Sequence, residues 1–151
     1  MNLSRRHAID TNLYIDALRT DDGMSALSAF QSAYTGFIVM SAVVVQELRA
    51  GARAGAGAQV LESTVIAPFE RRQRIITPTY WAWKECGRVL SELVGKGDSS
   101  SLPRSFVNDV LLAMSCREAG IVLVTRNLRD CERIARVRKF DFGAPWPGMS
   151  V

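Results

Sequence analysis

The stretch Gly120-Ile121-Val122-Leu123-Val124-Thr125-Arg126-Asn127 indicates the fold most clearly. Its four apolar residues follow the glycine without interruption, which is typical of a strand buried on both faces of a parallel sheet. The polar residues begin where this strand ends. In open α/β sheets, ligands bind outside the carboxyl ends of the strands. The stretch therefore predicts a parallel sheet and also the edge of that sheet where chemistry is expected.

Three more apolar runs predict strands, and helical segments separate them. The first run ends near Ile9, the others cover Phe37–Met40 and Ile75–Ile76, and a last strand is expected over 137–140. Helices are expected over 12–20, 24–33 (after a turn at 21–23), 42–49 with Ser41 as its cap, 58–71, 83–93, 104–119 and 128–135. This alternation predicts an α/β fold in which helices cover both faces of a mainly parallel sheet.

The composition fits one globular domain, expected to span residues 1–151. Apolar residues make up 48% of the chain and charged residues 23%. No apolar run approaches the ~20 residues that cross a bilayer, so no membrane segment is predicted. Cys86, Cys116 and Cys131 have neither zinc-site nor C-x-x-C spacing, which predicts reduced, mostly buried thiols in a cytoplasmic protein. The single histidine, His7, is expected at the surface.

Basic residues are in excess, and the formal net charge is +4. Of the 19 basic residues, 16 are arginine, whose planar guanidinium binds phosphate. This bias fits a nucleic-acid partner and fits a high-GC genome equally well. The arginines predicted to contact RNA, with a solvated face as the equal alternative, are Arg49, Arg53, Arg126 and Arg129. Trp81 and Trp83 can stack on bases, but a core or interface position is favoured because Trp83 falls on an apolar stripe.

Four acids lie at or near the predicted strand ends. Asp10 directly follows the first strand, and Asp130 follows the 120–127 stretch. Glu47 lies in the helix after the second strand, and Asp109 lies in the helix that leads into the strand at 121–124. One rim of a sheet can hold all four. Because crowded carboxylates repel one another, such a cluster needs a cation, and Mg²⁺ takes oxygen ligands of this kind.

Each acid also has a simpler explanation. Asp10 and Asp109 can cap helices, Glu47 can be a solvated residue that pairs with arginine, and Asp130 can pair with an arginine at helical spacing. Taken singly, these explanations are favoured for every acid except Asp10. The order of the four along the chain favours a shared site instead.

That order resembles the PIN-domain family, and specifically the VapC-type toxin of a toxin–antitoxin pair. The motifs that carry the resemblance are Asp10-Thr11-Asn12, Glu47-Leu48-Arg49-Ala50-Gly51, Asn108-Asp109 before Val110-Leu111-Leu112-Ala113, and Thr125-Arg126-Asn127 before Asp130. They span most of the chain. The resemblance implies a three-layer α/β/α sandwich, an endoribonuclease that depends on Mg²⁺ or Mn²⁺, a homodimer, and inhibition by a VapB-type antitoxin.

By position, the resemblance implies a catalytic set of Asp10, Glu47, Asp109 and Asp130. Asp10 and Asp109 would bind the metal directly, and Glu47 and Asp130 would bind it through water. Many family members have an acid directly after Thr-Arg, where this chain has Asn127, and Asp130 can supply that charge. Hydrogen-bonding residues would orient the acids, namely Thr11, Asn12, Thr125 and Asn127.

The reaction that follows is attack of a metal-activated water on an RNA phosphodiester, which leaves a 5′-phosphate and a 3′-hydroxyl. The alternative mechanism, in which two histidines act as acid and base and the 2′-hydroxyl attacks the phosphate, is not available because the chain has one histidine. One alternative is a PIN-like module that binds RNA or protein without cutting. The other is a phosphoacceptor or phosphotransfer domain, but the haloacid-dehalogenase pattern needs a second Asp at Asn12, and a receiver domain needs a lysine after a late strand, for which Lys139 is badly placed. The apolar helices over 12–33 and 58–71 can present a groove for a partner helix.

Overall fold

The computed structural model describes residues 5–52, 55–95 and 102–149. Within these ranges, five strands form one parallel sheet in the order β3-β2-β1-β4-β5. The strands are β1 (His7–Ile9), β2 (Ile38–Ser41), β3 (Ile75–Ile76), β4 (Val122–Val124) and β5 (Phe142–Gly143). Since every strand runs the same way, all their carboxyl ends meet at one edge of the sheet.

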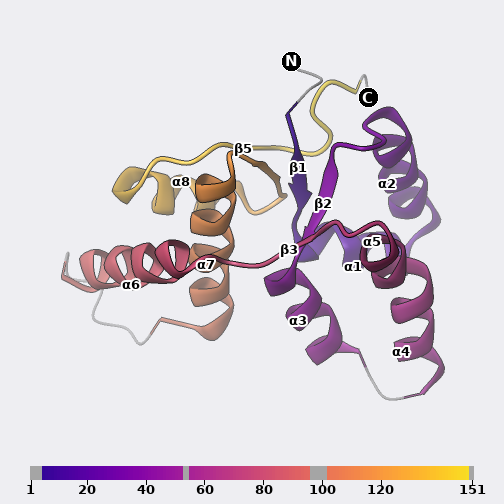
Figure 1. Cartoon of the computed structure of the whole chain (residues 1–151), viewed down its shortest axis with the longest axis horizontal. Helices are drawn as coiled ribbons and strands as arrows, with labels where there is room; N and C mark the ends of the chain where they lie inside the picture. Colours follow the sequence, from indigo (N-terminus) through magenta and orange to yellow (C-terminus); the bar gives the residue numbers. More distant parts are fainter. Residues whose placement is uncertain (1–4, 53–54, 96–101, 150–151) are drawn as a thin grey trace.

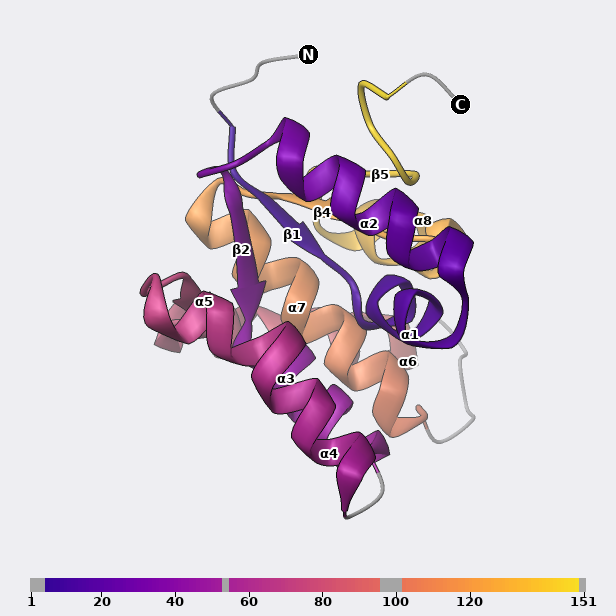
Figure 2. The same ribbon diagram turned by 90° about the vertical axis from the view of Figure 1, so that its right-hand side faces the viewer.

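Helices cover both faces of this sheet, so the predicted three-layer α/β/α fold is confirmed. Figure 1 shows α6, α7 and α8 to the left of the strands and α1, α2, α4 and α5 to the right; Figure 2 views the molecule from the right-hand side. The helices are α1 (Thr11–Arg19), α2 (Asp21–Ala33), α3 (Ala42–Gly51), α4 (Ala56–Val60), a π-helix (Leu61–Ile66), α5 (Ala67–Arg71), α6 (Tyr80–Gly95), α7 (Arg104–Ala119) and α8 (Leu128–Val137).

Two local signals fix the elements on either side of the sheet edge. The Ser41 hydroxyl accepts a hydrogen bond from the Val43 N–H at 3.1 Å and so caps α3, as predicted. Gly120 ends α7 in the left-handed conformation, with φ +66°. This conformation lets the Ile121 N–H reach the Cys116 carbonyl at 2.9 Å before β4 begins.

Two predicted boundaries were wrong. The turn expected at 21–23 is instead the first turn of α2, because the Thr20 hydroxyl accepts from the Gly23 N–H at 3.0 Å and two acids favour the helix N-terminus. The last strand is not at 137–140, because α8 continues to Val137. The strand that completes the sheet is Phe142–Gly143, which pairs with Leu123–Val124.

The helix predicted over 58–71 is present but not uniform. Helical structure runs from Ala56 to Arg71, and its middle part, Leu61–Ile66, is a π-helix. Pro68 lies two residues after the end of the π-helix. Proline has no N–H to donate and its ring crowds the preceding turn, which accounts for the wider turn at this place.

The predicted surface position of His7 was wrong, and of the core or interface position expected for Trp83 the structure excludes the core. His7 is only 1% exposed, because β1 is the middle strand of the sheet; its ring lies 5.8 Å from that of Phe30 and 5.1 Å from that of Tyr34. Trp83 is 58% exposed, since α6 buries a different stripe. That stripe consists of Ala82, Cys86, Val89 and Leu93. The three cysteines are free and buried, as predicted. None of the described helices is long and apolar enough to cross a membrane.

Candidate functional site

Asp10 lies at the centre of a hydrogen-bonded cluster at the carboxyl edge of the sheet. It follows β1, caps α1 and is 6% exposed. One carboxylate oxygen accepts from the Thr11 N–H and the other from the Thr125 hydroxyl, both at 2.7 Å. The Asn12 amide also donates to Asp10, at 3.4 Å. The Asp10 carboxylate is therefore fixed from β1, α1 and the end of β4 together.

Glu47 is tied to the same cluster from α3. The Thr11 hydroxyl donates to its carboxylate at 2.9 Å. Asn108 also forms a side-chain hydrogen bond with Glu47, which joins α7 to the site. Sequence reasoning did not single out Asn108 as a site residue. The available signal was its place directly before Asp109 in one of the quoted motifs.

The loop after β4 orients the fourth acid. The Thr125 hydroxyl accepts from the Asn127 N–H at 3.0 Å, and the Asn127 side-chain amide donates to the Asp130 carboxylate at 2.8 Å. Asp130 lies in the first turn of α8. Thr125 is fully buried and therefore links the Asp10 carboxylate to the loop that carries Asn127 and Asp130.

Charge coupling shows that the four predicted acids lie near one another. Burial and, to a lesser extent, the charges of Asp10, Glu47 and Asp130 together raise the pKa of Asp109 from 3.8 to about 7. Burial also raises the pKa of Asp10, against the hydrogen bonds from Thr125 and Thr11, which lower it. The pKa of Glu47 is raised by burial and by the charge of Asp10, and hydrogen bonds from Thr11 and Asn108 act against this.

Of the simpler explanations for the acids, the structure supports helix capping by Asp10 but not capping by Asp109. Asp10 does cap α1, in addition to its contacts with Thr125 and Asn12. Asp109 lies beyond the first turn of α7, which begins at Arg104, so it is not the cap of that helix. The arginine nearest to Glu47 in sequence, Arg49, pairs with Glu62 at 3.0 Å instead.

The donor set suits a hard divalent cation. Within residues 5–52, 55–95 and 102–149, no group of three or more Asp, Glu, His or Cys residues is already arranged to hold a metal ion. The four acids nevertheless offer only oxygen ligands, and the pKa values of Asp10, Glu47 and Asp109 are raised, with no cation among the described residues beside them to lower them. Mg²⁺ usually binds through one or two carboxylates and keeps several waters. Direct binding by two of the four carboxylates, with the other two binding through water, would fit this coordination.

The predicted RNA-binding arginines are spread over several environments. Arg126 donates to Asp16 of α1 at 3.0 Å, and Arg49 pairs with Glu62. Arg129 is exposed at the start of α8. Arg53 lies outside the described residues. Arg126 therefore ties the loop after β4 to α1 in this structure.

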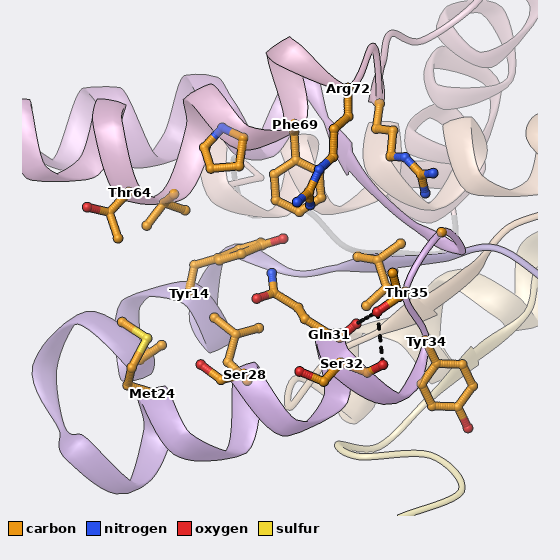
Figure 3. Close-up of a pocket in the computed structure, with 17 residues that line it drawn as sticks. Tyr14, Met24, Ser28, Gln31, Ser32, Tyr34, Thr35, Thr64, Phe69 and Arg72 are labelled. Carbon is orange, nitrogen blue, oxygen red and sulfur yellow. Dashed lines mark hydrogen bonds between the residues drawn. The ribbon is translucent and has the colours of Figure 1, made fainter.

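A groove of about 540 Å³ runs between α1–α2 and the π-helix with α5 (Figure 3). It lies where the sequence predicted a groove, between the helices over 12–33 and 58–71. Tyr14 and Phe69 contribute apolar surface, and their rings meet edge to face at 6.5 Å. Arg72 and Arg74 also line the groove, and none of the described residues that line it is acidic. The Tyr14 hydroxyl has no hydrogen-bond partner in the described part of the chain.

Comparisons with known proteins identify the family. Residues 8–137 match the model of the PIN domain. Among solved structures, the chain is similar to DNA-bound VapBC from Salmonella typhimurium (TM-score 0.71, 22% identity, 93% of this chain and 98% of that chain) and to VapBC2 from Rickettsia felis bound to a promoter DNA fragment (0.66, 22%, 91% and 97%). It is also similar to FitAcB from Neisseria gonorrhoeae (0.64, 17%, 93% and 98%). A comparison with curated protein sequences gave no match. Since the family model covers most of the sequence, this chain belongs to the PIN domain family.

Proposed function

We propose that the chain is a VapC-type toxin that hydrolyses RNA as a metal-dependent endoribonuclease. The observation that carries this proposal is the mutual coupling of the four acids, which contributes to raising the pKa of Asp109 to about 7. The hydrogen bonds described above come from neutral groups, so they orient the acids without neutralising them. The likeness to VapBC and FitAcB structures supports the toxin assignment.

In this proposal, Asp10 and Asp109 hold Mg²⁺ or Mn²⁺ directly, and Glu47 and Asp130 do so through water. When bound, the ion lowers the pKa of the attacking water and offsets charge on the scissile phosphate. Thr125 and Thr11 keep the Asp10 and Glu47 carboxylates pointed at the site.

The first test is cleavage of total cellular RNA by the purified chain in Mg²⁺, in Mn²⁺ and in EDTA. Cleavage at discrete positions is expected with either metal, and none in EDTA. Asp10→Asn should abolish it, whereas Asp22→Asn, an exposed acid of the first turn of α2, should not. The products should carry a 5′-phosphate and a 3′-hydroxyl, because water is the nucleophile. A 2′,3′-cyclic phosphate, or cleavage that survives in Asp10→Asn, contradicts the mechanism. Binding of RNA without cleavage would favour the non-catalytic module.

The second part of the proposal is a VapB-type antitoxin whose amphipathic helix occupies the groove of Figure 3. The apolar walls suit the apolar face of such a helix, and Arg72 with Arg74 suits an acidic side chain on it. Two serines of α2 give a matched test, since both are exposed but only Ser28 lines the groove, whereas Ser25 does not. Ser28→Trp should weaken binding of the cognate antitoxin and leave RNA cleavage unchanged. Equal weakening by Ser25→Trp would contradict the placement.

A further inference from the structure

The groove of Figure 3 contains a buried hydroxyl group whose hydrogen-bonding capacity the described chain leaves unused. Tyr14 is 1% exposed, and its hydroxyl has no hydrogen-bond partner among the described residues. Figure 3 shows this hydroxyl directed into the groove, between Phe69 of one wall and Gln31 of the other. A buried donor without a partner destabilises the folded chain. A ligand that brings a hydrogen-bond acceptor into the groove would satisfy it.

Two guanidinium groups of the groove lack a counter-charge. Arg72 and Arg74 line it, and neither forms an ion pair with any residue that the structure describes. Figure 3 shows the Arg72 side chain reaching from the end of α5 toward Tyr14. The Arg74 guanidinium lies beside Gly36, where an added Cβ would be 3.7 Å from it. Because a guanidinium binds phosphate through a planar fork of donors, this end of the groove is suited to a phosphate group.

The rest of the lining combines aromatic surface with side-chain hydrogen-bonding groups. The rings of Tyr14 and Phe69 offer surface against which a flat ring can pack. Polar side chains lie along the same walls, namely Ser28, Gln31 and Thr64. A hydrocarbon tail would leave these polar groups without partners, whereas a nucleobase has both an aromatic face and a hydrogen-bonding edge. The volume of about 540 Å³ lies within the range of small-molecule sites.

We propose that the groove binds a mononucleotide, whose phosphate lies at Arg72 and Arg74. Its base packs against the Phe69 ring and accepts a hydrogen bond from the Tyr14 hydroxyl. This site is separate from the four acids. Arg74 directly precedes β3 and Gly36 lies just before β2, so the phosphate end of the groove is at the amino edge of the sheet. The acids lie at the carboxyl edge, and the proposed nucleotide site therefore needs no metal ion.

The regulatory consequence of this site rests on the proposed function. A mononucleotide and the helix of the antitoxin would occupy the same groove, so each would lower the affinity of the chain for the other by the same factor. A mononucleotide would thus favour release of the antitoxin. Binding of the mononucleotide itself involves neither the antitoxin nor the acids, and it can be measured whether or not the chain is a ribonuclease.

Two neighbouring arginines provide a matched test by titration calorimetry of the purified chain with AMP, GMP, CMP and UMP in EDTA. EDTA removes any metal ion that would join a phosphate to the acids. At least one nucleotide should bind with a stoichiometry of one, and more tightly than inorganic phosphate. Arg72→Gln should weaken this binding about 10-fold or more. Arg71→Gln should not, because Arg71 is equally classed as exposed but does not line the groove. No binding of any of the four, binding no tighter than that of inorganic phosphate, or equal weakening by both substitutions overturns the proposal.

Tyr14→Phe gives a second test, because it removes the hydroxyl and keeps the ring. The hydroxyl is buried without a partner in the free chain, so the free chain should keep or gain thermal stability. Nucleotide binding should nevertheless weaken about 3–10-fold, since the ligand loses a hydrogen bond. These opposite effects separate a contact with the ligand from a structural role. An unchanged affinity in Tyr14→Phe contradicts the placement of the base.

Competition with the cognate antitoxin tests the shared groove. A saturating concentration of the nucleotide that binds should raise the apparent Kd of the antitoxin for the wild-type chain. The increase should be smaller for Arg72→Gln at the same nucleotide concentration, because this variant binds less nucleotide. Nucleotide binding with no effect on the antitoxin would support the nucleotide site and refute the placement of the antitoxin helix in the groove.

Discussion

The metal-free chain should lose stability as the pH rises through the titration of Asp109, and Asp109→Asn should remove that loss. The folded state holds a proton on Asp109 up to about pH 7, whereas the unfolded chain releases it near the ordinary pKa of 3.8. Between these values the folded state binds more protons than the unfolded state. The free energy of unfolding therefore falls as the pH rises from about 4 to about 7.

The size of the effect follows from the two pKa values. The difference between 3.8 and about 7, at about 1.4 kcal/mol per pH unit, sets an upper limit of about 4.5 kcal/mol. Asp109 is only partly buried, and solvent screening reduces the expected penalty to about 2–3 kcal/mol. An asparagine at this position is neutral at every pH. The stability of Asp109→Asn relative to wild type should thus rise by about 2–3 kcal/mol between pH 4 and pH 7.5.

The assay is urea unfolding of both proteins in EDTA across this pH range, repeated in Mg²⁺. Only the difference between the two proteins is interpreted, because the titration of His7 is present in both and cancels. Mg²⁺ should narrow the difference, since it stabilises the wild-type folded state by binding. Asp22→Asn is the control for loss of an exposed acid. A difference that stays constant with pH, or an equal rise in Asp22→Asn, would refute the reasoning.

Three further predictions concern single contacts. Thr125→Val removes the hydroxyl that donates to Asp10 at 2.7 Å. It should lower the affinity for Mn²⁺, measured by calorimetry, about 10–100-fold. An unchanged affinity would contradict the role of Thr125 in positioning Asp10. Gly120→Ala should lower the free energy of unfolding by about 1–2 kcal/mol, measured by urea unfolding, because alanine is strained at a φ of +66° even though nothing lies within 4 Å of the new Cβ. An unchanged free energy of unfolding would show that the backbone relaxes. Burial lowers the pKa of His7, so on acidification the unfolded chain binds a proton at this histidine before the folded chain does, and stability falls below pH 6.5. In melting curves, His7→Phe should lose less stability than wild type over this pH range. An equal loss in the two proteins would show that another group causes it.

The parallel sheet could be predicted because its signal is local. β2 and β4 are continuous apolar runs followed by polar residues, and both properties are read from a few neighbouring positions. The grouping of the acids could also be predicted, since parallel strands bring their carboxyl ends to one edge. The cap at Ser41 followed from the same local reasoning.

The burial of His7, the position of β5 and the exposure of Trp83 could not be predicted, because they depend on contacts between elements that are distant in sequence. His7 is buried because β1 has β2 on one side and β4 on the other, and no pattern within a three-residue strand indicates that central place. β5 has only two residues, and its pairing with β4 depends on where α8 ends. For Trp83, the apolar residues of α6 divide between two faces. Cys86 and Leu93 pack inward together with Ala82, whereas Trp83 lies on the exposed face.

The place of Asn127 in the site could be understood only from its hydrogen bonds in the structure. The sequence has Asn127 where many PIN proteins have an acid, which left either Asn127 or Asp130 to complete the site. The Asn127 N–H donates to Thr125 and its side chain donates to the Asp130 carboxylate at 2.8 Å. An aspartate at 127 could not make the second contact and would instead place a like charge beside Asp130, in a site where charge repulsion already raises the pKa of Asp109. The two residues therefore act as a pair, in which the asparagine orients the acid that carries the charge.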